Sequence, residues 1–417
     1  MVSVLVFPCG SEIGLEIGRS LRHVEDVHLV GASSVDDHGR FAFDHYVGGL
    51  PSVEDEDFPE RLADLAKALA IDFIFPAHDS VVLALSRCAE KFEAEILTSA
   101  LLTCEVTRSK RQTYEYLGGV LRTPRVYAER SGLPYPVFLK PDVGQGSKGT
   151  LTAFSDADVA GAFQRDGSLL VLEYLPGPEY TVDCFTDRSG VLRYAMPRVR
   201  RRIAGGISVN SSKVDLPEAA DLAHVINHAL ELRGAWFFQL KISSDGEPCL
   251  LEVAPRIAGT MAVSRAAGVN LPWLTLMDRL GREVQVRAHP FHVEVDRALG
   301  TRYRLGFEFE HVYIDLEPGL LICQQPSPEA MLYLHRCRNQ SKKTYLVTRG
   351  LPQEAVARQL QRAGIALTLF SEILALGQEE ALAPEPNAVV ISGQAQLVRF
   401  KDGSVCVFHP HDLECLL

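Results

Sequence analysis

The chain has 417 residues, of which 47% are hydrophobic and 23% are charged, a composition typical of a folded globular protein and not of a disordered one. Its 42 Lys and Arg against 53 Asp and Glu give a formal net charge of −11, which excludes a general attraction to nucleic acid or to an anionic membrane surface. No apolar run approaches the roughly 18 residues that span a bilayer, and the nine scattered cysteines form no CxxC pair, so we expect a cytoplasmic protein without a membrane or nucleic-acid partner.

Residues 1–105 alternate short apolar runs with amphipathic stretches, a pattern that predicts parallel strands joined by crossover helices in an open α/β sheet. The first turn, Gly10–Gly14, does not read GxGxxG, and tight strand–helix packing explains its glycines as well as a dinucleotide site does. The predicted strands include Val2–Phe7, Val27–Gly31 and Phe73–Pro76, and the predicted helices include Glu12–His23 and Ser80–Lys91.

From about Pro124 the pattern changes to pairs of strands bounded by glycine or proline, which predicts an α+β region. Ala235–Ile242 and Pro248–Val253 flank the hairpin signal Ser-Ser-Asp-Gly. Two further pairs are predicted, Val137–Lys140 with Thr150–Phe154 and Leu169–Leu175 with Thr181–Thr186.

A third α/β pattern begins near Phe307, with strands at His311–Ile314, Thr344–Val347 and Ala388–Ile391. Proline and charged residues around 285–306 indicate a boundary before it. We therefore predict three domains, at residues 1–105, 106–290 and 307–417.

Residues 136–149 offer the strongest candidate for an anion site. An apolar strand leads to Lys140, and a loop with Gly144, Gly146 and Gly149 follows at once. Glycines allow backbone N–H groups to close on an anion without hindrance from a Cβ atom, and the lysines add positive charge. The loop is therefore suited to nucleotide phosphates, although a solvated hairpin has the same composition.

Two later segments could complete a nucleotide site. Glu173 and Glu179, around a strand end, could reach an adenine amino group and ribose hydroxyls, although each could be an ordinary strand-end charge. Alternation along a hairpin could direct Gln239 and Glu252 to one face as oxygen ligands for Mg²⁺. Arg256 could then neutralise a transferring phosphate, or form a buried pair with a glutamate.

Over about residues 1–285 the chain resembles the ATP-grasp superfamily, because these motifs stand in the family's order and end in Glu-x-x-Pro-Arg. The resemblance implies that ATP and Mg²⁺ are bound. One departure is Ala254, which stands where the family has an asparagine ligand for magnesium. The implied nucleotide ligands are Lys110, Lys140, Gly146, Ser147, Glu173, Leu175 and Glu179, and the implied metal ligands are Gln239 and Glu252.

Most members of this family phosphorylate a carboxylate with ATP, and an amine or another nucleophile then captures the acylphosphate. A small carboxylate and a small amine are thus the expected substrates. Alternation along the strand predicts Arg198, Arg200 and Arg202 on one face, where they could bind the substrate carboxylate. A solvated basic edge or a nucleic-acid-binding surface would show the same sequence pattern. Arg265 could be a further clamp. The predicted catalytic residues are Arg256, Arg202 and Lys140.

Residues 307–417 resemble a haloacid-dehalogenase-like (HAD-like) domain whose motifs are degenerate. Asp315 stands at the nucleophile position, but Glu317 and Gly319 replace the acid/base aspartate and the threonine. Ser392 and Gly393 stand where an acidic pair would hold Mg²⁺, so phosphoaspartyl chemistry is expected to be lost. The expected roles are docking, homo-oligomerisation or shaping of the catalytic cleft.

The function that these observations favour is an ATP-dependent carboxylate–amine ligase that forms ADP and phosphate. Two alternatives stay open at this point. Ala254 is compatible with a regulatory protein that binds nucleotide without turnover, and the resemblance is also compatible with an enzyme that forms carbamoyl phosphate or carboxyphosphate.

Overall fold

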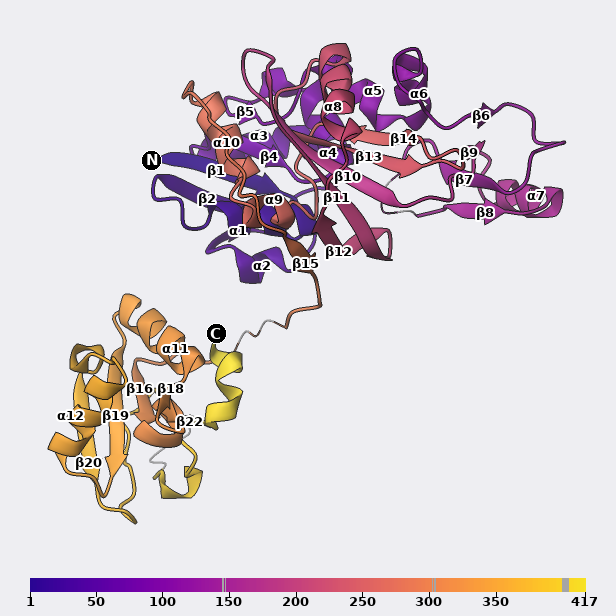
Figure 1. Cartoon of the computed structure of the whole chain (residues 1–417). Helices are drawn as coiled ribbons and strands as arrows, with labels where there is room; N and C mark the ends of the chain where they lie inside the picture. The colour runs from indigo at the N-terminus through magenta and orange to yellow at the C-terminus, as the bar shows by residue number, and fades with distance from the viewer. Residues whose placement is uncertain (145, 147, 302, 304, 400–404) are drawn as a thin grey trace. The chain divides into compact units, whose positions relative to one another are not determined.

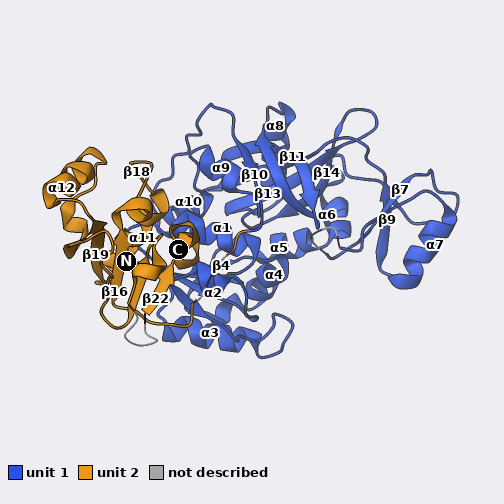
Figure 2. Cartoon of the chain, turned by 90° about the horizontal axis from the view of Figure 1, so that it is seen from below, with its two compact units in different colours: residues 1–299 blue, residues 300–417 orange. Residues whose placement is uncertain are grey.

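The computed structural model describes residues 1–144, 146, 148–301, 303, 305–399 and 405–417. The chain divides into two compact units, residues 1–299 and 300–417, which Figure 2 distinguishes by colour. The division falls inside the 285–306 segment, and the first unit contains both predicted regions 1–105 and 106–290. Among the described residues, no helix has both the length and the apolar character that a bilayer crossing requires.

The N-terminal part of the first unit is a parallel five-stranded sheet in the order β3-β2-β1-β4-β5, which confirms the predicted open α/β sheet. Alternate residues of β1 enter two different cores, Val4 on the α1 side and Leu5 on the α3 side. Helices therefore cover both faces, as buried parallel strands require. The strands are β1 (Val2–Phe7), β2 (Val27–Ala32), β3 (His45–Val47), β4 (Phe73–Pro76) and β5 (Glu95–Ile96), and the helices are α1 (Glu12–Leu21), α2 (Gly39–Ala42), α3 (Phe58–Ala68) and α4 (Asp79–Arg87).

Two more sheets complete this unit and confirm the α+β prediction (Figure 1). A four-stranded sheet has the order β6-β9-β7-β8, and a six-stranded sheet has the order β14-β13-β10-β11-β12-β15. The strands are β6 (Val126–Tyr127), β7 (Val137–Pro141), β8 (Leu151–Ala153), β9 (Leu169–Glu173), β10 (Glu179–Thr186), β11 (Leu192–Ala204), β12 (Ile207–Lys213), β13 (Gly234–Ile242), β14 (Pro248–Ala254) and β15 (Glu294–Asp296). The helices are α5 (Leu101–Arg108), α6 (Lys110–Leu117), α7 (Asp156–Arg165), α8 (Glu218–Ala229), α9 (Ala262–Ala266) and α10 (Leu271–Arg279).

The predicted pairing of Leu169–Leu175 with Thr181–Thr186 is wrong, because β9 and β10 belong to different sheets. The Pro-Gly-Pro segment between them carries the chain from the four-stranded to the six-stranded sheet. There the Gly177 N–H donates to the Ile242 carbonyl at 2.9 Å, and a Cβ atom on Gly177 would lie 2.6 Å from Ile242. Close backbone approach, and not a hairpin turn, explains this glycine.

The second unit has a parallel sheet in the order β20-β19-β16-β21-β22, which confirms its predicted α/β character. Its core combines alternate residues of β16 with the apolar faces of the two helices, among them Val312, Leu334 and Leu360. The HAD-like assignment of this unit stays a prediction. The elements are β16 (His311–Asp315), β17 (Leu321–Ile322), β18 (Gln325–Pro326), α11 (Pro328–Asn339), β19 (Lys343–Arg349), α12 (Gln353–Arg362), β20 (Glu372–Leu376), β21 (Ala388–Ile391) and β22 (Val405–Phe408).

Candidate active site

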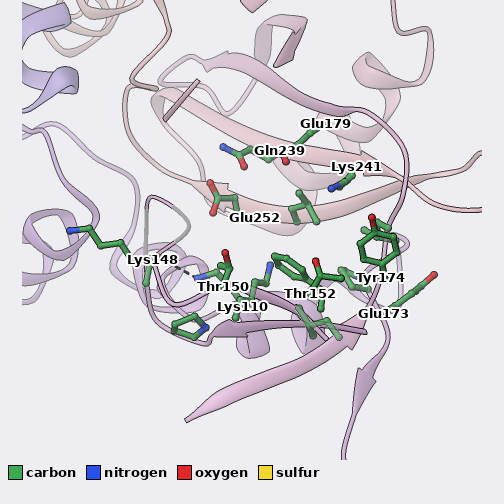
Figure 3. Close-up of a pocket in the computed structure, with 18 of the residues that line it drawn as sticks. Lys110, Lys148, Thr150, Thr152, Glu173, Tyr174, Glu179, Gln239, Lys241 and Glu252 are labelled. Atoms are coloured by element: carbon green, nitrogen blue, oxygen red, sulfur yellow. Dashed lines mark hydrogen bonds between the residues drawn. The ribbon is translucent and has the colours of Figure 1, made fainter. Parts of the chain in front are cut away.

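A cavity of about 240 Å³ lies between the four-stranded and the six-stranded sheet. Figure 3 shows Glu179, Gln239 and Glu252 on one side of it, with Thr150 and Lys110 on the other. We name this cavity the nucleotide cavity. Of the predicted site residues, those that line it are Lys110, Lys140, Gly146, Glu173, Leu175, Glu179, Gln239 and Glu252. Ser147 lies outside the described residues.

Lys140 on β7 is buried, and its ammonium donates to the Tyr114 hydroxyl at 2.7 Å. Burial and the nearby charge of Lys110 lower the pKa of Lys140 to about 8. Lys110 begins α6 directly after α5 ends, and its ammonium donates to the Asp142 and Gly144 carbonyls at 3.1 and 3.3 Å. Two partly desolvated ammonium groups thus face one cavity, an arrangement suited to a polyanion.

Gln239 and Glu252 lie directly opposite each other in the β13–β14 ladder, so the prediction that they share one face is confirmed. Gln239 Oε1 accepts from Arg200 at 3.2 Å. Within the described residues, the Glu252 carboxylate has no hydrogen-bond or ion-pair partner. An unpaired carboxylate beside two lysines is suited to a hard divalent cation.

Ala254 follows Glu252 by two positions on β14 and therefore lies on the same face. It is buried and packs with Phe237 and Ala258. The position thus supplies a methyl group where the family supplies an amide oxygen. The described residues contain no group of three or more His, Cys, Asp or Glu side chains placed to hold a metal ion.

The far end of the nucleotide cavity is formed by β9 and β10. Leu175 is buried there, and Glu173 accepts from the Arg122 guanidinium at 3.3 Å and from the Arg125 N–H at 3.2 Å. Glu179 forms an ion pair with Arg200. Glu173 and Glu179 therefore both line the cavity, as predicted. Each is also paired with an arginine, Glu173 with Arg122 and Glu179 with Arg200, and the sequence motif predicted neither pair.

A second cavity of about 320 Å³ adjoins the first, and we name it the acceptor cavity. Gly146, Lys148, Arg200, Gln239 and Glu252 line both cavities. The other lining residues include Glu12 of α1, His78 and Asp79 at the start of α4, Arg198 of β11, and Arg256 after β14. The two cavities thus share two cationic side chains, Lys148 and Arg200, and the Glu252 carboxylate.

Arg256 lines the acceptor cavity, and its guanidinium forms a two-pronged pair with Asp79 at 2.6 and 2.7 Å. Charge attraction between the pair lowers the pKa of Asp79 and raises that of Arg256. The arginine also lies over the Phe237 ring, 5.1 Å from its centre. Asp79, the carboxylate partner of Arg256, lies on α4, next to the N-terminal sheet. The sequence had instead suggested that a glutamate would pair with Arg256.

The arginine strand departs from the predicted pattern. A bulge in the β11–β12 ladder pairs Arg200 with Ser211 and Arg202 with Asn210, so these two arginines lie on opposite faces. The prediction of a shared face is therefore wrong for Arg202, whose guanidinium pairs with Asp296 at 2.7 Å and lines neither cavity. Arg198 is buried against Asp183 at 3.0 Å and does line the acceptor cavity.

Arg265 also lines neither cavity, and its guanidinium pairs with Glu16 of α1 at 2.8 Å.

The glycine loop that contains Gly146 packs against a second glycine turn. Gly205 and Gly206 both have positive φ, and a Cβ atom on Gly206 would lie 1.9 Å from the Gly146 carbonyl oxygen. Only glycine permits this approach of two backbones.

The second unit presents a different arrangement around Asp315. The Ser392 hydroxyl donates to this carboxylate at 2.5 Å, and burial raises the pKa of Asp315. Thr348 is buried at the end of the neighbouring strand β19 and donates to the Leu374 carbonyl at 3.3 Å. Asp315 is thus held by a hydroxyl, and no group of metal-ligating side chains is found near it among the described residues.

One family model matches residues of the first unit. A model of the family described as ATP-grasp in the biosynthetic pathway with Ter operon matches residues 165–298. A search of curated protein sequences finds no match.

Among solved structures, biotin carboxylase from Campylobacter jejuni, in complex with β,γ-ATP, aligns with a TM-score of 0.58 at 15% identity, over 70% of this chain and 74% of that one. The L-amino acid ligase from Bacillus licheniformis aligns with a TM-score of 0.56 at 19% identity, over 67% and 74%. Rhizobium etli pyruvate carboxylase aligns with a TM-score of 0.56 at 17% identity, over 68% of this chain, which spans only 29% of that protein.

Proposed function

We propose that the protein is an ATP-dependent ligase that joins a small carboxylate to a small amine. The ATP-grasp family model that matches residues 165–298, and the similarity of the fold to biotin carboxylase and to an L-amino acid ligase, support this proposal. The observation that carries the proposal is the pair of adjoining cavities with Glu252, Gln239 and Arg200 in their common wall. A nucleotide in the first cavity would present its terminal phosphate to an acceptor in the second.

In this proposal Lys110 and Lys140 hold the phosphates, and the backbone around Gly146 covers them. Glu173 and Leu175 hold the adenine, and Glu179 holds the ribose. The biotin carboxylase structure in complex with β,γ-ATP supports a nucleotide site in this fold.

The site fits Mg²⁺, because the Glu252 carboxylate is unpaired among the described residues and the Gln239 amide oxygen lies beside it. Mg²⁺ commonly takes one or two protein oxygens together with phosphate oxygens and water, so Ala254 does not preclude binding. When bound, the ion supplies positive charge at the phosphates. Glu252 and Gln239 are the residues that would hold it.

The reaction follows from charge and position. A carboxylate oxygen of the substrate forms a bond to the γ-phosphorus while the β–γ bridging P–O bond breaks, which gives ADP and an acylphosphate. The amine nitrogen then forms the C–N bond, phosphate leaves, and the nitrogen loses a proton. Arg200 and Arg256 stabilise the negative charge, and Lys140 orients the phosphates.

His78 is a candidate acceptor for that proton. It lines the acceptor cavity, and burial lowers the pKa of its imidazole, so the neutral form prevails at pH 7. Its Nδ1 lies 2.6 Å from the Ser80 hydroxyl, which orients the ring. A neutral imidazole is the form that accepts protons.

The test is to incubate the protein with ATP, Mg²⁺ and a panel of carboxylates and amines, and to measure ADP. The proposal predicts ADP release that requires one carboxylate and one amine together. Tight nucleotide binding with no ADP from any pair would instead support the regulatory alternative, which Ala254 favours. ADP release with bicarbonate alone would support carboxyphosphate formation.

The second unit is proposed to be a degenerate HAD-like domain without phosphatase activity, used for docking or homo-oligomerisation. The Asp315 carboxylate is held by the Ser392 hydroxyl, and among the described residues no group of metal-ligating side chains lies beside it, which supports this role. The nine cysteines form no disulfide, which supports a reducing, cytoplasmic location.

A further inference from the structure

Lys241 on β13 lines the nucleotide cavity, and no step of the proposed reaction uses it. Its side chain is half-buried, and within the described residues its ammonium has no hydrogen-bond or ion-pair partner. Lys110 and Lys140, in contrast, each donate to an oxygen of the protein. An ammonium that is partly withdrawn from water and lacks a protein acceptor gains stability when a ligand supplies one.

The neighbours of Lys241 define the part of the cavity that it faces. Lys241 follows Gln239 by two positions on β13, so both side chains lie on the same face, about 7 Å apart along the strand. Figure 3 shows both on one side of the cavity, with Lys241 nearer to Tyr174. The next carbonyl, of Ile242, accepts from the Gly177 N–H in the segment that connects β9 to β10. Lys241 therefore lies between the end proposed for the metal ion and the phosphates and the end proposed for the adenine.

A carboxylate faces the same part of the cavity from the neighbouring strand. Glu179 on β10 lies directly opposite Lys241, and residues in such positions have Cβ atoms about 5 Å apart. Among the described residues the two side chains form no ion pair, and Glu179 pairs instead with Arg200 through Oε1. Its second oxygen, Oε2, has no hydrogen-bond partner within the described part of the chain. This wall of the cavity thus presents one strong donor and one strong acceptor to a ligand.

A pair of adjacent hydroxyl groups complements this arrangement. A hydroxyl both donates and accepts hydrogen bonds, so one hydroxyl can donate to the carboxylate while its neighbour accepts from the ammonium. In a nucleotide the ribose carries such a pair, the 2′- and 3′-hydroxyls, and the ribose stands between the base and the phosphates.

We propose that Lys241 is a specificity-determining residue that, together with Glu179, selects nucleotides with both ribose hydroxyls. The inference rests on the nucleotide site of the proposed function, and it is independent of which carboxylate and amine are joined. A hydrogen bond to a charged group contributes about a tenfold factor to affinity, so loss of either hydroxyl should have a measurable effect.

The experiment is calorimetric titration of the full chain with ADP, 2′-deoxy-ADP and 3′-deoxy-ADP in the presence of Mg²⁺. The unaltered protein should bind ADP about tenfold more tightly than either deoxynucleotide. Lys241→Met retains the length of the side chain and removes the ammonium. It should weaken ADP binding about tenfold and leave unchanged the affinity for one deoxynucleotide, the one that lacks the hydroxyl bound by Lys241. Lys241→Arg retains a cationic donor and should keep the preference for ADP.

The matched control is Lys148→Met, which removes an exposed ammonium that lines the same cavity from the glycine loop. It should weaken all three nucleotides by the same factor and so retain the preference for ADP. Each preference is a ratio measured within one variant, so a partial loss of folded protein does not alter it.

Three results would overturn the inference. In the first, the unaltered protein binds the three nucleotides equally. In the second, Lys241→Met weakens all three by one factor, which would assign the ammonium to the phosphates or the base. In the third, Lys148→Met removes the preference as Lys241→Met does. Absence of binding by all three nucleotides is a different result, because it would refute the nucleotide site and the proposed function together with this inference.

Discussion

The nucleotide cavity of the first unit and the Asp315 region of the second unit differ in how their charges are compensated. Lys140 and Glu252 are buried or half-buried groups of opposite sign that face one cavity without pairing with each other. Asp315 is a single carboxylate that a serine hydroxyl already holds. Burial lowers the pKa of Lys140 and raises that of Asp315, because in both cases it disfavours the charged form. The presence of a motif residue therefore indicates catalytic activity only where neighbouring side chains do not already bind its charged group.

The largest effect is expected from removing either charge in the nucleotide cavity. Lys140→Ala and Glu252→Ala should each lower the rate of ADP formation by at least about a hundredfold, since each removes a preorganised charge beside the transferring phosphate. Asp315→Asn is the control in the other unit and should leave the rate unchanged. Loss of a phosphatase activity in Asp315→Asn would show that the two regions are alike after all.

The Asp79–Arg256 pair should dominate the stability of the acceptor cavity. Asp79→Ala leaves a buried guanidinium without its partner, so the free energy of unfolding should fall by about 3 kcal/mol. Glu105→Ala, which breaks the exposed pair with Arg87, should cost less than about 1 kcal/mol. Urea denaturation of the full chain measures both, and equal losses would contradict the structural role of the buried pair.

The lowered pKa of Lys140 predicts a pH dependence of nucleotide affinity. The protonated form binds phosphates, and its population falls as pH rises through about 8, so affinity for ADP should weaken about tenfold between about pH 7 and pH 9. Lys140→Arg keeps its charge across this range and should show a flat profile. A dependence that persists in Lys140→Arg would assign the titration to another group.

The smallest effect is expected at Ala254. Ala254→Asn places an amide oxygen on the face that Glu252 occupies, so the Mg²⁺ concentration for half-maximal activity should fall about threefold. Ala254→Leu adds similar volume without an oxygen and serves as the control. Equal Mg²⁺ requirements in the two variants would show that this position does not face the ion.

Local patterns predicted much of the first unit correctly. The strand before Lys140 and the opposed positions of Gln239 and Glu252 follow from period-two alternation over a short hairpin. The shared face of Arg200 and Arg202 did not follow, because a bulge adds one residue to β11. Such a bulge depends on how two strands pair, and alternation in one strand contains no information about it.

The sequence also could not predict which residues far apart in the chain contact each other. Asp79 lies 177 residues before Arg256, and only the packing of the N-terminal sheet against the six-stranded sheet brings them together. The contact of Gly206 with Gly146 depends in the same way on two distant turns, although a Gly-Gly pair was a visible signal for close approach. Tyr114, the partner of Lys140, carried no such signal.

The most direct test is a crystal structure of the protein with a non-hydrolysable ATP analogue and Mg²⁺. The account predicts that the triphosphate lies between the four-stranded and six-stranded sheets, with Lys110 and Lys140 at its phosphates and Glu252 at the metal ion. An analogue bound elsewhere, or bound here with its phosphates turned away from Lys140 and Glu252, would contradict it.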